Sequence, residues 1–366
     1  MRSQILSAVL LLPLLSQAAD IRISDLRTRA EAGDATAQVL LGDAYRDGAG
    51  VAQNYEQAAK WYSAAAEQGN AEAQGSLGFL YSLGRGVDRD YASAEKWYRK
   101  AAKQGNAVAM FNLGTLYYNG NGVAINDTSA YAWFALAEKA GSKEGADAVR
   151  RMTTELPAWR LADGKIALAN MLLAGDDIPR AFAEAVRLYE ELAAQMPQLW
   201  VRLAKVYIVG SAVPHDYRRA EQYCMNAASA KVISGMTCLG YLYASGFLLP
   251  ESPERGFFWY DKAAHLGDPF AWYGLGLMYY EGRGTKQDNH QGYKWLLIAT
   301  RAYVPTALKS FDSVNAQIDG QTAKKLQRKA FDQQRRASQE AAKLPYSRQS
   351  EPFDVLLIPH DSATSK

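Results

Sequence analysis

The chain has 366 residues, of which 48% are hydrophobic and 22% are charged, and this composition is typical of a folded globular protein. The formal net charge at pH 7 is only +3. Such a small charge argues against a nucleic-acid partner, because nucleic-acid-binding domains concentrate basic residues on one face.

Residues 1–19 are predicted to be a secretory signal peptide. Arg2 supplies a short positive end, the segment 5–15 is largely apolar, and the small residues Ser16 and Ala18 suit cleavage after Ala18 or Ala19. The apolar run is too short to cross a bilayer as a helix, and no later segment reaches 18 apolar residues. We therefore expect an exported protein, periplasmic or secreted, with no integral membrane segment after cleavage. An uncleaved interfacial anchor is the alternative.

The N-terminal part of the mature chain, residues 20–142, repeats with a period of 36 residues. In its first unit, the spacing of Ala37, Leu41 and Tyr45 predicts a helix over 35–47 with one apolar stripe. The glycines of the segment 48–50 end that helix, and the segment 55–68 predicts a second one. Each unit is therefore predicted to be a helical hairpin. The residues that recur in phase are Gly33, Gly69, Gly105 and Gly141, then Tyr45, Tyr81 and Tyr117, and then Trp61, Trp97 and Trp133.

A further glycine recurs inside the first helix of each hairpin. Glycine within a helix costs about 1 kcal/mol relative to alanine. Its recurrence predicts close packing against an aromatic ring of the facing helix. The positions are Gly42, Gly78, Gly114, Gly240 and Gly276.

The period is interrupted at residues 143–163, a segment that contains Pro157 and is predicted to be an irregular helical connector. It either separates two lobes or kinks one superhelix. The period returns over residues 164–304, where Tyr207, Tyr243 and Tyr279 mark it. Capping helices are expected over 305–344 and a flexible tail over 345–366. The apolar run 355–358 of this tail is predicted to dock on the repeats or on a partner.

The last predicted helix, residues 321–343, carries seven Lys or Arg residues and only two acidic ones. Two interpretations remain open. The helix is either a solvated cap of the repeat array, or a basic amphipathic helix that contacts anionic lipid or an acidic polymer.

Only two cysteines are present, Cys224 and Cys238. In an oxidising compartment such a pair is a disulfide candidate, and the repeat places the two residues on neighbouring helices. A bond between them and two separately buried thiols are equally compatible with the sequence. The C-x-x-C spacing of a redox-active pair is absent.

The repeat unit as a whole resembles the Sel1-like repeat, a relative of the tetratricopeptide repeat. The resemblance rests on the pattern A-x-A-Q-x-x-L-G-x-x-Y, then G-x-G-V, then A-x-x-W-Y-x-x-A-A-x-x-G, and it covers most of the chain. It implies an all-α fold, a right-handed α-solenoid of about seven helix-turn-helix repeats with a C-terminal capping helix. It also implies an adaptor role in secretion, envelope assembly or signalling, and some proteins of this family act in exopolysaccharide export.

The concave face of such a solenoid is the predicted binding groove. Counting from the Leu41-Gly42 pair of the first helix places Val39, Asp43 and Arg46 on this face. Aromatic side chains there suit recognition, because rings provide contact area at a low entropic cost. Packing between repeats is the alternative role for these side chains. The predicted groove residues are Phe79, Phe111, Tyr118, Lys205, Tyr241, Phe270, Tyr273 and Tyr280.

We therefore expect a non-enzymatic scaffold that binds a protein or peptide partner in envelope biogenesis or secretion. An accessory protein for exopolysaccharide assembly or export is the alternative within the binding class, because aromatic rings stack on sugars. A hydrolase of the cell envelope is the alternative from another class, although no convergent polar cluster is evident. The four histidines form no i,i+4 pair and no H-E-x-x-H motif, so we expect no metal, cofactor or catalytic residue.

Overall fold

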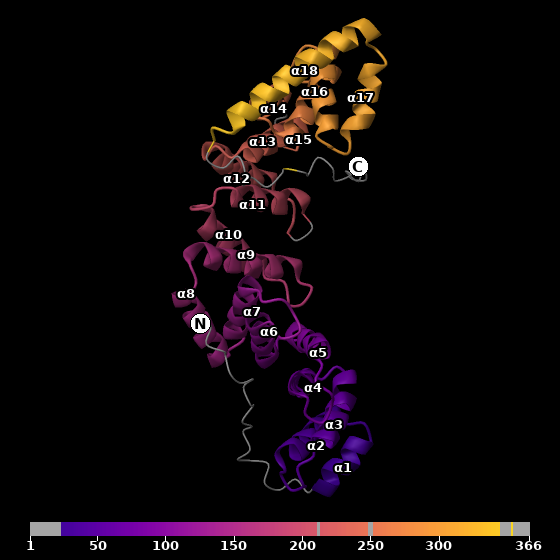
Figure 1. Cartoon of the computed structure of the whole chain (residues 1–366), viewed down its shortest axis with the longest axis vertical. Helices are drawn as coiled ribbons and strands as arrows, with labels where there is room; N and C mark the ends of the chain where they lie inside the picture. Colours follow the sequence, from indigo (N-terminus) through magenta and orange to yellow (C-terminus); the bar gives the residue numbers. More distant parts are fainter. Residues whose placement is uncertain (1–22, 211–212, 248–251, 345–352, 354–366) are drawn as a thin grey trace. The chain divides into compact units, whose positions relative to one another are not determined.

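The computed structural model describes residues 23–210, 213–247, 252–344 and 353, and Figure 1 shows the helices in chain order. No β-strand occurs among these residues, and 18 helices are present in them. The predicted all-α fold class is therefore confirmed. The predicted signal peptide, residues 1–19, and the apolar run 355–358 lie outside the described residues.

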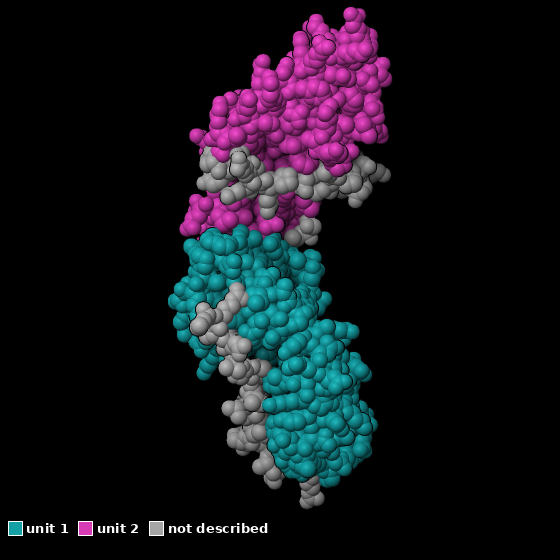
Figure 2. Space-filling view, viewed as in Figure 1, with its two compact units in different colours: residues 1–188 teal, residues 189–366 magenta. Residues whose placement is uncertain are grey.

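The chain divides into two compact units, residues 1–188 and 189–366, and the boundary falls within one helix, α10 (Figure 2). The predicted connector, residues 143–163, contains α8 and the beginning of α9. The helices that start in the first unit are α1 (Ile23–Glu31), α2 (Ala35–Asp47), α3 (Tyr55–Glu67), α4 (Ala71–Leu83), α5 (Tyr91–Lys103), α6 (Ala107–Asn119), α7 (Asp127–Lys139), α8 (Lys143–Glu155), α9 (Ala158–Ala174) and α10 (Phe182–Ala193). The helices of the second unit are α11 (Leu199–Val209), α12 (Tyr217–Ser229), α13 (Ile233–Ala244), α14 (Pro253–His265), α15 (Pro269–Glu281), α16 (Asn289–Arg301), α17 (Ala307–Asn315) and α18 (Gly320–Ala341).

The helices pack as hairpins at the predicted period. In the first unit α2 packs on α3, α4 on α5 and α6 on α7, and in the second unit α11 packs on α12, α13 on α14 and α15 on α16. The first helices of successive hairpins also contact each other, since α4 touches α6 and α13 touches both α11 and α15. Each unit therefore presents a row of first helices, on which the predicted groove residues lie. In the second unit α18 packs over α16 and also reaches α14.

Capping residues explain where the helices of the repeat begin and end. Asp34 precedes α2, and its side chain accepts a hydrogen bond from the backbone N–H of Ala37. Asn70 and Asn106 make the equivalent bonds before α4 and α6. Gly48 ends α2 with a φ of 74°, in the left-handed region that favours glycine. The predicted helix over 35–47 therefore coincides with α2.

The glycine inside the first helix packs against an aromatic ring of the second helix at four of the five predicted positions. A Cβ atom built on Gly42 would lie 2.6 Å from the ring of Tyr62, and one on Gly114 would lie 2.5 Å from the ring of Phe134. Gly78 and Gly240 meet Tyr98 and Tyr260 in the same way. Gly276 is the exception, because its neighbour is Leu296 and not an aromatic ring. Four of the five glycines thus make room for a ring that lies between two helices.

Replacing Gly114 by alanine is expected to destabilise the protein by about 1–3 kcal/mol, although alanine is the better helix former. The added methyl group would overlap Cδ1 of Phe134, so the ring or the helix must move. Urea denaturation followed by circular dichroism measures the change. Gly320→Ala is the matched control, because a Cβ atom there meets nothing within 4 Å. A loss at Gly114 no greater than that of the control would contradict this packing interpretation.

Candidate functional site

The predicted groove residues of the first unit are largely part of its packing. Phe111 and Tyr118 are 4% and 5% exposed, and their rings lie 5.4 and 6.4 Å from the ring of Phe134. The prediction that these two residues contact a partner is therefore wrong, because both rings fill the space between α6 and α7 and a partner cannot reach them. Phe79 is half-buried on α4 and is packed against the core formed by α2, α3 and α4.

Polar residues of the same face also have partners within the fold. Arg46 is 8% exposed and pairs with Asp43 at 2.9 Å and with Asp47 at 2.7 Å. The hydroxyl of Tyr62 donates a hydrogen bond of 2.6 Å to Asp43, and burial raises the pKa of the Asp43 carboxyl. Val39 is buried as well. These residues stabilise the first hairpin and offer little to a ligand.

The predicted groove residues of the second unit are more accessible. Phe270, Tyr273 and Tyr280 on α15 are half-buried, as is Lys205 on α11. The hydroxyl of Tyr280 accepts a hydrogen bond of 2.9 Å from the side-chain amide of Gln317, just after α17. The three rings of α15 therefore remain the best candidates for partner contacts in the described part of the chain.

Tyr241 is 3% exposed, and a residue from outside the repeat helices helps to cover it. The ring of Phe353, which is 0% exposed, lies 5.6 Å from that of Tyr241. The ring of Tyr241 also lies 5.7 Å from that of Phe247, and Phe247 stacks on Tyr217 at 4.6 Å. Phe353 lies two residues before the apolar run 355–358 that was predicted to dock, and it was not itself among the predicted residues.

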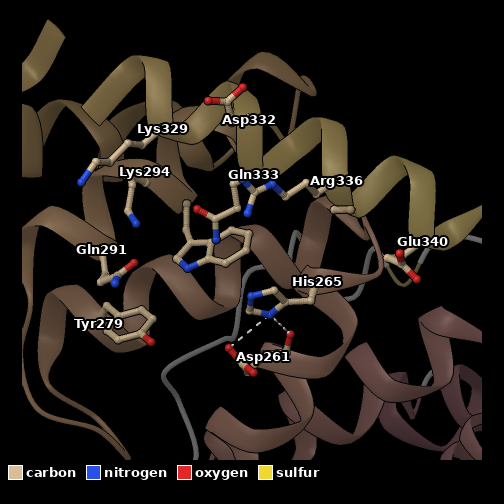
Figure 3. Close-up of a pocket in the computed structure, with 12 residues that line it drawn as sticks. Asp261, His265, Tyr279, Gln291, Lys294, Lys329, Asp332, Gln333, Arg336 and Glu340 are labelled. Atoms are coloured by element: carbon tan, nitrogen blue, oxygen red, sulfur yellow. Dashed lines mark hydrogen bonds and ion pairs between the residues drawn. The ribbon is translucent and has the colours of Figure 1, made fainter. Parts of the chain in front are cut away.

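A cavity of about 540 Å³ lies between α14, α16 and α18 in the second unit, with Tyr279 of α15 at its edge (Figure 3). Trp295, which is 1% exposed, forms part of its wall. In Figure 3 Lys329, Gln333 and Arg336 extend from α18 toward the side of the cavity where Lys294 lies. The complete lining is Asp261, His265, Tyr279, Gln291, Lys294, Trp295, Lys329, Asp332, Gln333, Arg336, Ala337 and Glu340.

His265 in this cavity has an acidic partner, whereas Lys294 lies near another cation. Nδ1 of His265 lies 2.8 Å from the carbonyl oxygen and 3.4 Å from the carboxylate of Asp261, and this pairing raises the pKa of the imidazole. Burial and the neighbouring Lys329 lower the pKa of Lys294. The lining holds three Lys or Arg and three Asp or Glu residues, and one of its amines, that of Lys294, is partly desolvated. Sequence reasoning had identified the basic last helix, but not the cavity beneath it.

Cys224 on α12 and Cys238 on α13 form a disulfide bond, with their Cα atoms 5.8 Å apart. Both residues are 0% exposed. Of the two alternatives left open by the sequence, the structure contains the bond that joins adjacent helices. Because α12 and α13 belong to successive hairpins, the bond connects two repeats.

Neither a metal centre nor a membrane span is found in the described parts of the chain. Residues 23–210, 213–247, 252–344 and 353 include no group of three or more His, Cys, Asp or Glu side chains placed to hold a metal ion. Within the same ranges no helix combines the length and the apolar character needed to cross a membrane.

A family model described as "Sel1 repeat" matches seven segments, and together they make up more than half of the chain. The matched segments are residues 35–70, 71–106, 107–142, 162–195, 201–231, 234–268 and 269–303.

Two curated alginate biosynthesis proteins are also similar to part of the chain. The alginate biosynthesis protein AlgK of Pseudomonas syringae pv. tomato is 27% identical over 126 residues, which cover 34% of this chain and 27% of that protein. AlgK of Azotobacter vinelandii is 27% identical over 125 residues, with the same two coverages. The matched part of the chain thus spans only about a quarter of the length of these relatives.

Two solved structures were also found to be similar. One is a protective antigen with an SLR fold from uropathogenic Escherichia coli, with 21% identity and a TM-score of 0.36, covering 94% of this chain and 91% of that one. The other is a Sel1 repeat protein from Oxalobacter formigenes, with 25% identity and a TM-score of 0.37, covering 81% of this chain and 83% of that one.

Proposed function

The chain belongs to the Sel1 repeat family, and on that premise we propose that it is a non-enzymatic scaffold that binds a protein or peptide partner on the row of first helices in its second unit. Helical-repeat proteins bury their apolar stripes between neighbouring repeats and leave extended surfaces for recognition. Phe270, Tyr273 and Tyr280 lie on such a surface, at half-buried positions of α15. A half-buried aromatic ring is already ordered and loses little entropy when a partner covers it.

One observation carries this proposal. Phe353, which belongs to no repeat helix, is completely buried against Tyr241 of α13. The surface of α13 therefore accepts an aromatic side chain that arrives on a separate segment. Burying a phenylalanine side chain contributes about 1.5–3 kcal/mol. A partner peptide with an aromatic anchor would use the same chemistry on the adjoining surface of α15.

We place this activity in the periplasm, in envelope biogenesis or secretion. The predicted signal peptide at residues 1–19 supports export, and the bond between Cys224 and Cys238 is of the kind that persists in oxidising compartments. A disulfide that joins two repeats suits a scaffold that must keep its shape outside the cytoplasm.

Changing Tyr273 and Tyr280 together to alanine is expected to reduce partner capture by more than about tenfold, because the loss of aromatic anchors dominates binding energy at such surfaces. Capture is measured by chemical crosslinking in the periplasm followed by mass spectrometry. Circular dichroism must show unchanged helicity.

Phe258→Ala with Tyr303→Ala is the matched control for this experiment. These two rings are 49% and 90% exposed, lie in the same unit and are outside the first helices. Removing them should leave capture unchanged. Equal capture by the Tyr273/Tyr280 variant and the wild type would exclude α15 as the binding surface.

The partial similarity to AlgK favours a second candidate function, an accessory role in exopolysaccharide assembly or export. Under this alternative the rings of α15 contact sugars instead of a peptide. This alternative would be favoured if the wild type binds an oligosaccharide, the Tyr273/Tyr280 variant does not, and no protein partner is crosslinked.

A hydrolase function, the alternative from another class, would require substrate turnover that a single polar substitution abolishes.

A further inference from the structure

We propose that the cavity between α14, α16 and α18 binds an acidic saccharide, through the carboxylate of a uronate-type sugar. The site is separate from the surface considered above, since none of the predicted groove residues lines it. The two proposals therefore stand or fail independently.

The cations of the cavity lack counterions. Lys294, Lys329 and Arg336 form no ion pair with any residue for which the structure gives a position. The three acidic residues of the lining, in contrast, each pair with another side chain. Asp261 pairs with His265, Asp332 with Arg335 at 3.3 Å, and Glu340 with Lys343 at 2.6 Å. The three cations are therefore available to bind an anion.

The arrangement of these cations favours a planar carboxylate. Figure 3 shows Lys329 and Arg336 on α18 and Lys294 on α16 facing the same space, while Asp332 points away from it. Arg336 can pair with a carboxylate through two parallel hydrogen bonds, and Lys294 adds a point charge from the opposite helix. Partial burial of Lys294 strengthens this attraction, because fewer water molecules compete for its amine.

The rest of the lining suits the neutral part of a sugar. Gln291 and Gln333 both donate and accept hydrogen bonds, as sugar hydroxyls require. Tyr279, which is half-buried, provides aromatic surface for the ring. A volume of about 540 Å³ lies within the range of small-molecule sites. The carboxylates of Asp261 and Glu340 can accept hydrogen bonds from the several hydroxyl groups of a sugar. Together these features favour a sugar acid over a phosphate.

Binding is tested with the full chain by calorimetry and by tryptophan fluorescence, since Trp295 lines the cavity. The ligands are tetrasaccharides of galacturonate, mannuronate and glucuronate, a neutral glucose tetrasaccharide, and inorganic phosphate. At least one uronate tetrasaccharide should bind about tenfold more tightly than the neutral one, as expected for charge-assisted hydrogen bonds. If phosphate binds as tightly as every uronate, the cavity is a general anion site and the assignment to a sugar acid is wrong.

Lys294→Gln with Arg336→Gln is expected to weaken uronate binding by about tenfold or more. The matched control is Lys324→Gln with Arg328→Gln, which removes the same charge from exposed positions of α18 that do not line the cavity. The Lys324/Arg328 variant should change the affinity for the uronate by less than about twofold, because exposed charges far from a ligand contribute little to its binding. Equal affinities of the two double variants would overturn the proposal, whether or not the Tyr273/Tyr280 variant affects partner capture.

Discussion

Phe134→Ala should lower the free energy of unfolding of its repeat by about 3–5 kcal/mol. The ring of Phe134 is 0% exposed and fills the space that Gly114 leaves on the facing helix. It also contacts the rings of Phe111 and Tyr118. Truncation to alanine removes all these contacts at once and leaves a cavity that a pair of helices cannot close without moving.

The loss in free energy of unfolding is measured by hydrogen exchange of peptides from α6 and α7 at increasing urea concentrations. Peptides are followed separately because the repeats of a solenoid differ in stability. Phe258→Ala is the control, since that ring is 49% exposed and its removal should change stability by no more than about 0.5 kcal/mol. Similar losses for the two variants would mean that Phe134 does not hold its hairpin together.

Removing the disulfide is the second large effect that we expect. Replacing Cys224 and Cys238 by alanine should destabilise the second unit by about 3 kcal/mol, the value that loop-closure entropy gives for a cross-link across about 15 residues. The change also removes two completely buried sulfur atoms from the packing between α12 and α13. The stability of peptides from these two helices, measured by hydrogen exchange in urea, reports the loss.

A reducing agent provides the matched comparison for this prediction. Reduction of the wild-type protein should lower the stability of α12 and α13 by a similar amount, and it should have no effect on the alanine variant. If reduction leaves the wild type unchanged while mass spectrometry shows free thiols, the bond does not stabilise the second unit.

The repeat architecture could be predicted because several local signals agree. Asp34 caps α2, Gly48 ends it in the left-handed region, and the apolar stripe between them has helical spacing. Each of these features depends only on residues a few positions apart, so the helix ends can be located from the sequence alone. The last helix was predicted as 321–343 and is observed as α18, Gly320–Ala341, for the same reason.

The candidate sites could be predicted only in part, because exposure depends on neighbours that are distant in the sequence. Phe111 and Tyr118 occupy positions that the helical count assigned to the groove, yet both turn toward Phe134 of the next helix. The burial of Tyr241 depends on Phe353, more than a hundred residues later. No periodicity within one repeat contains this information.

The cavity was beyond prediction for a related reason. Its walls come from α14, α16 and α18, and α18 follows the last matched repeat. The sequence indicated only that the last helix is basic and that it either caps the array or contacts anionic lipid or an acidic polymer. Lys329 and Arg336 face Lys294 because α18 packs over α16, a contact between helices that no local pattern specifies.

The scaffold function is tested most directly by a photoreactive phenylalanine analogue placed at residue 273 of the full chain, expressed in its native cells. Illumination should attach one defined partner to this position on α15. The same analogue at position 258, on the exposed face of α14, should not crosslink to that partner. Labelling of the same protein with equal yield at both positions, or of no protein at position 273, would contradict recognition by the first helices.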